Sequence, residues 1–369
     1  MSDVRRARAA LSRLVEPGDK AVHALVGEVG PVEAVERICA GRGTYARFGA
    51  RVRTLDTGRD LATAAKVGAR LVVPGDDEWP ERLDDLPTPP FCLWVRGPVP
   101  LGEALGRSVA VVGARIASSY GEQLAAELAA GLATRGWTVV SGAAFGIDAA
   151  AHRGALAVDG ATVAMLASGV DRVYPAAHSR LLARIAETGA VVSEVAPGCA
   201  PMKSRFLQRN RLIAAATRGT VVVEAGLRSG SRNTVTHASE LARPVGAVPG
   251  PVTSMSSAGC HQEIRDGRAT LVTSADEVID LVGDLGQDAC EPARGPVAAG
   301  DALLPRDAAV LEALPYRGGL DLERVVALTT LPPLIVRAAL TRLELEGLAE
   351  TDGTTWRKRR SRTAHAVVQ

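Results

Sequence analysis

The sequence predicts an α/β protein with a Rossmann-like parallel sheet core, an N-terminal helical domain and a C-terminal winged helix. The sheet is predicted by short β-branched apolar runs that alternate with helical patterns; these runs cover residues 108–113, 138–142, 161–166, 190–195, 220–225 and 244–250. Strands that are apolar throughout and alternate with helices form parallel sheets covered by helices on both faces. Right-handed crossovers then place every loop that follows a strand at the same edge of the sheet.

The length of 369 residues exceeds what one hydrophobic core usually organises, so more than one domain is expected. Prolines punctuate residues 74–100, and this spacing predicts a connector that packs along the next domain rather than a continuous helix. The predicted parts are a helical domain (1–72), the Rossmann-like domain with its connector (73–285), a linker (286–302), a winged-helix domain (303–357) and a basic tail (358–369).

The N-terminal pattern predicts short helices separated by glycine turns. Residues 4–15 are helical in pattern, Asp19 is placed to cap a second helix through Val26, and Pro31 fits the first turn of a third helix after the turn at 27–30. Two such helices resemble a helix-hairpin-helix or sterile-alpha-motif-like (SAM-like) module, in which backbone N–H groups face phosphate. A plain structural helical bundle is the alternative.

The C-terminal pattern predicts a winged helix, in which three helices precede a hairpin around Asp352 and Gly353. Residues 303–356 contain five arginines and eight acidic residues, which disfavours a duplex-DNA surface and a role as a transcription factor. The segment Arg357–Arg362 is strongly basic, and either a solvated tail or a phosphate contact explains it.

Composition narrows the function classes. The net charge is only +2, so any affinity for nucleic acid requires a local basic cluster. The five cysteines are widely spaced and form no CxxC pair, which predicts reduced thiols and no metal site. The basic N-terminus has no apolar segment after it, and no run approaches about 20 apolar residues, so we expect a cytoplasmic protein without a membrane partner.

The loop after the first buried strand has the residues of a phosphate-binding turn. Gly113 allows close approach to the backbone, Arg115 offers a guanidinium fork, and Ser118 and Ser119 precede a helix N-terminus. The loop lacks the later glycines of GxGxxG, and the chain has no GxxxxGK[ST] motif, so neither a dinucleotide cofactor nor ATP is expected.

The loop after the second strand offers another close approach at Gly142. We expect Asp148 to cap the following helix and His152 to pack or hydrogen-bond, because no serine or cysteine nucleophile accompanies that histidine. The loop after the fifth strand combines glycine and hydroxyl groups before another helix; its residues are Ser229, Gly230 and Ser231. Together the three loops predict an extended groove for an anionic polymer.

The segment from residue 201 to residue 211 is basic and contains an aromatic ring. Its predicted binding residues are Lys203, Phe206, Arg209, Asn210 and Arg211. Backbone charge and a ring that stacks on any base are the requirements of single-strand binding without sequence preference. The alternative is a surface amphipathic helix that turns Phe206 into the core.

The motifs VAVVGARIASSYG, VVSGAAFGIDAAAH, GVDRVYP, RFLQRNR, VVVEAGLRSGS and AVPG, in this order, resemble the motif set of the DprA/Smf family of DNA-processing proteins, over roughly residues 76–280. In that family's pattern, Gly113 and Arg115 match a G-x-R element, and Lys203 with Phe206 a basic-plus-aromatic element. Residues 209–211 match an RNR triplet. Arg232, His261 and Arg268 depart from the pattern, and Arg232 is expected to offer an additional phosphate contact.

The resemblance implies a homodimer that binds and protects single-stranded DNA without catalysis or a cofactor. It also implies loading of the RecA recombinase during recombination or natural transformation. The alternative is a nucleotide-processing hydrolase similar to the phosphoribohydrolases. That alternative is disfavoured because GLRSGSRNT replaces their PGGxGTxxE loop and Glu240 is displaced.

Overall fold

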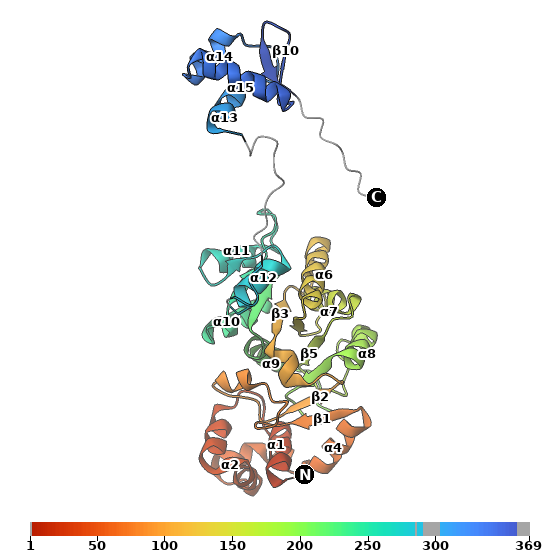
Figure 1. Ribbon diagram of the computed structural model, residues 1–369. Helices are drawn as coiled ribbons and strands as arrows, with labels where there is room; N and C mark the ends of the chain where they lie inside the picture. Colours follow the sequence, from red (N-terminus) through yellow and green to blue (C-terminus); the bar gives the residue numbers. More distant parts are fainter. Residues whose placement is uncertain (1, 285, 291–302, 360–369) are drawn as a thin grey trace. The chain divides into compact units, whose positions relative to one another are not determined.

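The computed structural model describes residues 2–284, 286–290 and 303–359 (Figure 1). The chain divides into two compact units, Met1–Cys290 and Glu291–Gln369. Most of the predicted linker and the end of the predicted basic tail lie outside the described residues. The boundary expected after residue 72 stays a prediction, since the N-terminal helices belong to the same compact unit as the sheet.

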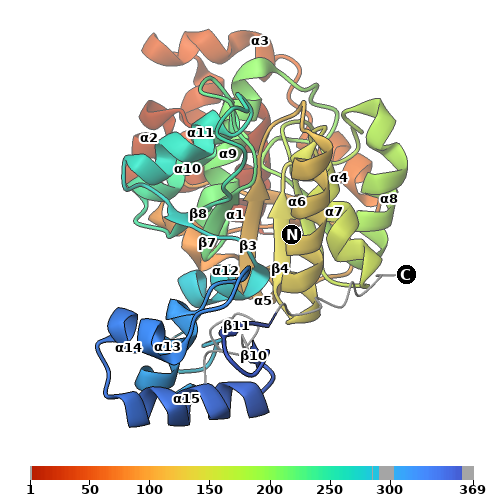
Figure 2. The same cartoon turned by 90° about the horizontal axis from the view of Figure 1, so that it is seen from above.

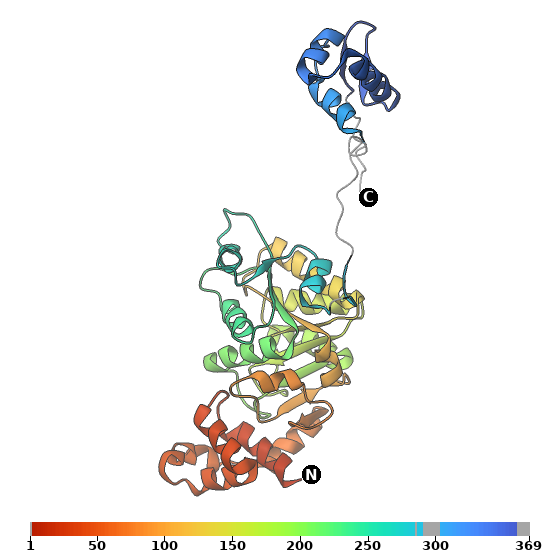
Figure 3. The same cartoon turned by 60° about the vertical axis from the view of Figure 1, so that its left-hand side comes forward.

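Helices form the N-terminal part of the first unit and lie together at one of its ends (Figure 3, red). They are α1 (Asp3–Leu14), α2 (Lys20–Ala40), η1 (Gly43–Phe48), α3 (Gly49–Val52) and α4 (Thr57–Lys66). The predicted cap is confirmed, because the Asp19 carboxylate accepts a hydrogen bond from the Val22 N–H at 3.2 Å. The predicted break is also present: Gly30 adopts φ 80°, and the helix resumes at Pro31.

A nine-stranded sheet forms the centre of the first unit, in the order β1-β2-β6-β5-β4-β3-β7-β8-β9. Its strands are β1 (Ala69–Val72), β2 (Leu93–Arg96), β3 (Ser108–Val112), β4 (Thr138–Ser141), β5 (Thr162–Leu166), β6 (Ala190–Ser193), β7 (Gly219–Val222), β8 (Val245–Ala247) and β9 (Thr270–Leu271). All pairings among β3 to β9 are parallel, as the alternation of strands and helices predicts.

The structure corrects two expectations about the sheet. It is mostly rather than wholly parallel, because β2 pairs antiparallel with β6 and β1 pairs antiparallel with β2. The proline-rich segment is also more than a connector: it contains a short 3₁₀ helix, η2 (Glu81–Asp85), and β2 itself, where Trp94 lies opposite Ser193. Prolines at both ends of β2 leave a run too short to be recognised as a sheet strand by its pattern alone.

Helices cover both faces of the sheet (Figure 2). They are α5 (Leu101–Gly106), α6 (Ser119–Thr134), α7 (Ile147–Ala157), α8 (Ser179–Thr188), α9 (Lys203–Ala216), α10 (Ser231–Glu240), α11 (Ala258–Arg265) and α12 (Ala275–Val282). Side chains along β3 alternate between the faces: Val109 and Val111 pack with α6, α7 and α12, whereas Ala110 and Val112 pack with α9 and α10. In Figure 2, α6 and α7 lie to the right of β3, and α9 and α10 to its left.

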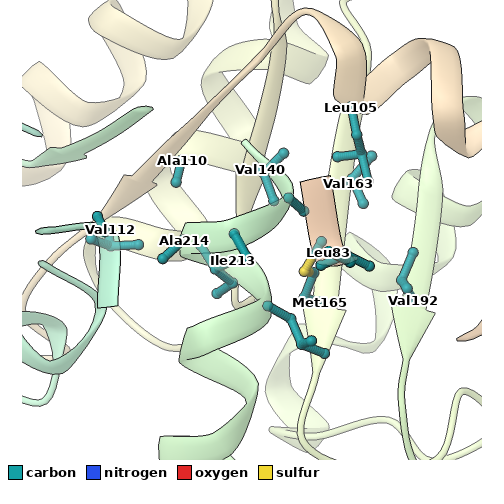
Figure 4. Close-up of a cluster of buried hydrophobic side chains, with 14 of the residues drawn as sticks. Leu83, Leu105, Ala110, Val112, Val140, Val163, Met165, Val192, Ile213 and Ala214 are labelled. Atoms are coloured by element: carbon teal, nitrogen blue, oxygen red, sulfur yellow. The ribbon is translucent and has the colours of Figure 1, made fainter. Parts of the chain in front are cut away.

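The proline-rich segment contributes to the larger core cluster (Figure 4). Leu83 from η2 is fully buried and lies with Met165 of β5, Val192 of β6 and Ile213 of α9. The segment therefore holds α9 against the sheet, and α9 carries most of the basic residues predicted to bind DNA.

The second unit contains α13 (Pro305–Ala313), α14 (Leu322–Thr329), α15 (Pro333–Leu345) and a hairpin of β10 (Ala349–Thr351) and β11 (Trp356–Lys358). It has its own apolar cluster, which includes Val310, Val336 and Leu340. Across the described part of the chain, no single helix has the length and apolarity of a membrane span. Helices α14 and α15 together are long and apolar enough for a span, but they are bent by 108° at the break between them.

We expect Leu83→Ala to lower the free energy of unfolding of the first unit by about 2–5 kcal/mol, because the truncation leaves a cavity in a close-packed core. Guanidinium denaturation followed by tryptophan fluorescence measures the change. Leu227→Ala is the matched control, because Leu227 is 48% exposed and its truncation is expected to change stability by less than about 0.5 kcal/mol. Equal midpoints for Leu83→Ala and the wild type would contradict the packing role of the proline-rich segment.

Candidate functional site

A cleft of about 540 Å³ opens at the carboxyl edge of the sheet, between the loops after β3 and β7 and the exposed side of α9. Residues from three separate predicted motifs line it. These are Gly113, Arg115, Phe206, Arg209, Asn210, Ser229, Gly230 and Ser231. The remaining predicted residues, Ser118, Ser119, Gly142, Lys203 and Arg211, are not part of its lining.

Arg115 and Phe206 lie against each other at this cleft. The guanidinium carbon of Arg115 is 5.0 Å from the centre of the Phe206 ring, within the range of a cation–π contact. Arg115 is exposed and, within the part of the chain that the structure describes, pairs with no carboxylate. Phe206 is half-buried, and Tyr174 lies on it with ring centres 5.6 Å apart. The cleft therefore presents a positive charge and an aromatic face side by side.

Arg209 also lines the cleft, but its guanidinium is buried. Only 5% of the residue is exposed, and Nη1 donates hydrogen bonds to the carbonyls of Gly142, at 2.7 Å, and Met165. Burial lowers the pKa of Arg209 to about 10, so the side chain stays charged at neutral pH. A Cβ at Gly142 would collide with this guanidinium. The close approach predicted at Gly142 is therefore made by Arg209 and not by a phosphate.

Arg211 does not face the cleft, which corrects its predicted role in DNA contact. It is 4% exposed, and Nη2 lies 2.6 Å from Oε1 of Glu194, which is itself buried at the end of β6. A buried ion pair of this kind is strongly destabilised when one partner is removed. Arg211 therefore joins α9 to the sheet.

The helix N-terminus after β3 is occupied by a carboxylate of the protein itself. Glu224, which follows β7, accepts hydrogen bonds from the Ser118 N–H at 2.9 Å and from the Ser118 hydroxyl at 2.6 Å. The Ser118 hydroxyl oxygen in turn caps α6 by accepting from the Gly121 N–H. A Cβ at Gly121 would collide with the Glu224 carboxylate. Ser118 therefore stabilises the loop. A Cβ at Gly113 would collide with the Ile147 side chain, so this glycine makes room for a neighbour within the protein. Arg115 and the exposed hydroxyl of Ser119 are the parts of the predicted phosphate cradle that remain available.

The basic residues at the start of α9 differ in their availability. Lys203 is exposed at the first turn and has no carboxylate partner among the described residues. Arg205 is held by Glu16 of the N-terminal helical part, with Nη2 to Oε1 at 2.7 Å. Only Lys203 of these two remains available to a phosphate near the cleft.

Asp148 and His152 have structural roles. The Asp148 Oδ2 accepts hydrogen bonds from the N–H groups of Gly142 and Ala144, so it holds the loop before α7 rather than acting as the helix N-cap, which is Gly146. Burial raises the pKa of Asp148. His152 is fully buried with Nδ1 2.7 Å from the Thr162 hydroxyl, which confirms the predicted hydrogen-bonding role. Burial lowers the pKa of His152 to about 3, so it is neutral at physiological pH.

The loop after β7 brings hydroxyl groups and one unpredicted arginine to the cleft. The hydroxyls of Ser229 and Ser231 lie 2.8 Å apart, and Asn210 donates to the Gly230 carbonyl at 3.3 Å. Arg228 also lines the cleft and is exposed. Sequence reasoning missed Arg228, although its place directly before the serine-glycine-serine run was a usable signal.

The expected additional phosphate contact at Arg232 is corrected, because its Nε lies 2.6 Å from Oε1 of the buried Glu263. Arg268 uses the other oxygen of the same carboxylate, at 2.7 Å. The two arginines that depart from the family pattern thus neutralise one internal acid. In the described ranges, no group of three or more His, Cys, Asp or Glu side chains is arranged to hold a metal ion.

Comparisons with known proteins identify the family of this chain. The family model for DNA recombination-mediator protein A matches residues 70–283. A Mycobacterium tuberculosis protein with the provisional name DNA processing protein DprA is 46% identical over 99% of this chain and 97% of its own length.

Two solved structures are also similar. The X-ray structure of DprA from Streptococcus pneumoniae has a TM-score of 0.65 and 32% identity, covering 77% of this chain and 99% of that one. A Helicobacter pylori DNA processing protein A, whose structure describes a single-stranded DNA binding mode, has a TM-score of 0.52 and 27% identity, covering 57% of this chain and 94% of that one. The chain therefore belongs to the DNA recombination-mediator protein A family, whose members carry the names DprA and Smf.

Proposed function

We propose that this protein binds single-stranded DNA at the cleft, with Arg115 on a phosphate and Phe206 stacked on a base. The observation that carries the proposal is the 5.0 Å contact between that free guanidinium and that half-buried ring at an open cleft. Charge attracts any backbone and a ring stacks on any base, so the pair suits a partner without fixed sequence. The binding mode named for the Helicobacter pylori relative supports the same class of ligand.

Other residues complete the proposed site. Lys203 and Arg228 supply exposed positive charge, and Ser119 is an exposed hydroxyl at the start of α6. Gly113, Asn210, Ser229, Gly230 and Ser231 shape the wall of the cleft. In this proposal Arg209 acts through position, since its Nη1 donates to two backbone carbonyls and its Nε to the Asn210 side chain. Its guanidinium carbon lies 5.9 Å from the centre of the Phe206 ring.

We further infer that the protein acts by binding rather than by catalysis or with a cofactor. The carboxylate that lines the cleft among the described residues is Asp148, and its hydrogen bonds to the preceding loop assign it to holding that loop. Glu240 is the acid closest in the sequence to the position of the glutamate in the phosphoribohydrolase loop. It lies at the end of α10 beside His237 and not in the cleft. The structural role of Asp148 and the position of Glu240 outside the cleft support the binding function.

The wider role is proposed from family membership. It includes a homodimer in the cytoplasm that protects single-stranded DNA and loads RecA in recombination or natural transformation. For the flanking parts we propose a SAM-like or helix-hairpin-helix module at residues 1–72 and a winged helix at 303–357. The helices α13 to α15 followed by a hairpin support the latter.

Replacing Arg115 by alanine should weaken binding to oligothymidylate and flatten its salt dependence. Loss of one phosphate contact reduces the slope of log K against log salt by about 0.7 for a single strand. Titrations by fluorescence anisotropy at several salt concentrations measure both quantities, and Lys203→Ala should behave alike. Arg184→Ala, an exposed arginine on α8 outside the cleft lining, is the control. Unchanged affinity and slope in Arg115→Ala would remove it from the site.

Replacing Phe206 by alanine should also weaken binding, but with the salt slope retained. Stacking of one base contributes about 1–3 kcal/mol and releases no counterions. The same titrations test this, and Phe206→Tyr, which keeps a ring, should stay near the wild type. A flattened slope in Phe206→Ala would mean that the variant disturbs Arg115 rather than a base.

The RecA part of the proposal predicts faster filament assembly. Adding the protein to RecA and single strands coated with single-strand-binding protein should shorten the lag in RecA ATP hydrolysis, because a mediator that holds the strand exposes it to RecA. Arg115→Ala should restore the lag. If wild-type protein that binds single-stranded DNA leaves the lag unchanged, RecA loading is refuted. The DNA-binding function is not affected by that result.

A further inference from the structure

Aromatic side chains are scarce in this chain, yet two further rings are exposed beside the cleft. Aromatic residues make up 3% of the sequence, and of the phenylalanines, Phe48 and Phe91 are buried in packing contacts. Phe145, in the loop after β4, is 48% exposed, and Tyr174, in the loop after β5, is 45% exposed. Exposed aromatic rings are suited to binding because they offer a large, rigid apolar face, so these two rings at one edge of the sheet are candidates for a binding role.

The loop after β5 connects these rings to the cleft. Tyr174 lies on Phe206 with ring centres 5.6 Å apart and planes inclined by 57°. Four residues later, His178 meets the edge of Phe145 with ring centres 4.6 Å apart. The Nδ1 of His178 lies 3.0 Å from the carbonyl of Ala143, in the loop after β4, and this contact joins the two loops. One short segment therefore touches Phe206 at its start and Phe145 at its end.

The loop that carries Phe145 also lies directly against the loop of Arg115. The Ile147 N–H donates to the Ala114 carbonyl at 3.2 Å. A Cβ at Gly146 would collide with the same carbonyl, and Ala144 is part of the cleft lining. Phe145 thus stands at the β4 side of the cleft, next to the Arg115 loop.

Positive charge accompanies the rings. Arg172 and Arg180 flank the segment that carries Tyr174 and His178, and both are exposed. Neither forms an ion pair within the described parts of the chain. The nearby acid, Asp171, accepts a hydrogen bond from the Gly198 N–H at 2.6 Å, so its charge is partly satisfied by the backbone. Rings with unpaired arginines beside them repeat the chemistry of the cleft itself.

We propose that Phe145 and Tyr174 form a second stacking surface, which extends the single-strand site from the cleft across the ends of β4 and β5. The inference rests on the proposed function, since the strand must first be held at Arg115 and Phe206. Neighbouring strands of a sheet are about 4.8 Å apart, so two strand ends add a span suited to further nucleotides of the same DNA. The ligand of this surface is the continuation of the bound strand, read by stacking and without sequence preference.

The full-length protein is titrated with oligothymidylates of increasing length, from about 4 to about 16 nucleotides, the range of site sizes of proteins that bind single strands. Wild-type affinity should rise until the strand spans both surfaces. Phe145→Ala should bind the shortest strands like the wild type and the longest about 5- to 100-fold more weakly. Tyr174→Ala should weaken binding at every length, and most for the longest strands, because its ring also contacts Phe206. Phe206→Ala should weaken binding at every length.

Ring-conserving variants are the controls. Phe145→Tyr and Tyr174→Phe should keep wild-type affinity at all lengths, whereas Val158→Ala, at the other end of α7, should change nothing. DNA strands with the fluorescent base 2-aminopurine at successive positions give a second readout. The wild type should quench the fluorescence at two separate positions along the strand, and Phe145→Ala at only one.

The outcomes separate this inference from the function on which it rests. A loss confined to long strands supports the second surface. If Phe145→Ala binds strands of every length like the wild type, or loses the same affinity at every length, the second surface is overturned. Phe206→Ala still reports on the cleft in that case. Absence of oligothymidylate binding by the wild type refutes the proposed function itself.

Discussion

The cleft depends on one buried charge, the guanidinium of Arg209. It reaches from α9 to the carbonyls at the ends of β4 and β5, and Gly142 leaves room for it. Burying a cation is costly unless its donors are satisfied, and here backbone acceptors supply that satisfaction. Because residues three apart share one face of a helix, fixing Arg209 also fixes Phe206 at the cleft.

Four arginines around the sheet edge are paired with carboxylates of the protein itself. Glu194 takes Arg211, Glu263 takes two arginines, and Glu16 takes Arg205. Glu224 occupies the helix N-terminus that an external phosphate would otherwise use. Within the described ranges, the exposed cations without a carboxylate partner at or near the cleft are Arg115, Lys203 and Arg228. Affinity for a polyanion therefore depends on where these few charges stand.

The aromatic rings, like the positive charges, are divided between structural positions and positions at the edge of the sheet. Buried rings such as Phe48 and Phe91 stabilise the helical part. Phe145 and Tyr174 instead lie in the loops after the neighbouring strands β4 and β5, and Phe206, on α9, lies beside Tyr174. A polymer that must be held at several points without regard to sequence is served by repeated stacking surfaces better than by one deep pocket. The elongated arrangement of the edge loops follows from the parallel strand order, since each crossover returns its loop to the same edge.

Local patterns in the sequence determined the buried strands β3 to β8, the Asp19 cap, the break at Gly30 and the loops that meet at the cleft, because periodicity and capping act over a few residues. Only the tertiary structure decided that β2 joins the sheet, since its partner is about a hundred residues away in the chain. It also decided which arginines are free. The sequence predicts DNA contact for both Arg115 and Arg211. In the structure, Arg115 faces solvent beside a ring, whereas Arg211 is buried against Glu194. An ion pair between residues in different elements leaves no local pattern in the sequence. Arginines that bind a ligand can therefore be told from structural arginines only in the folded protein.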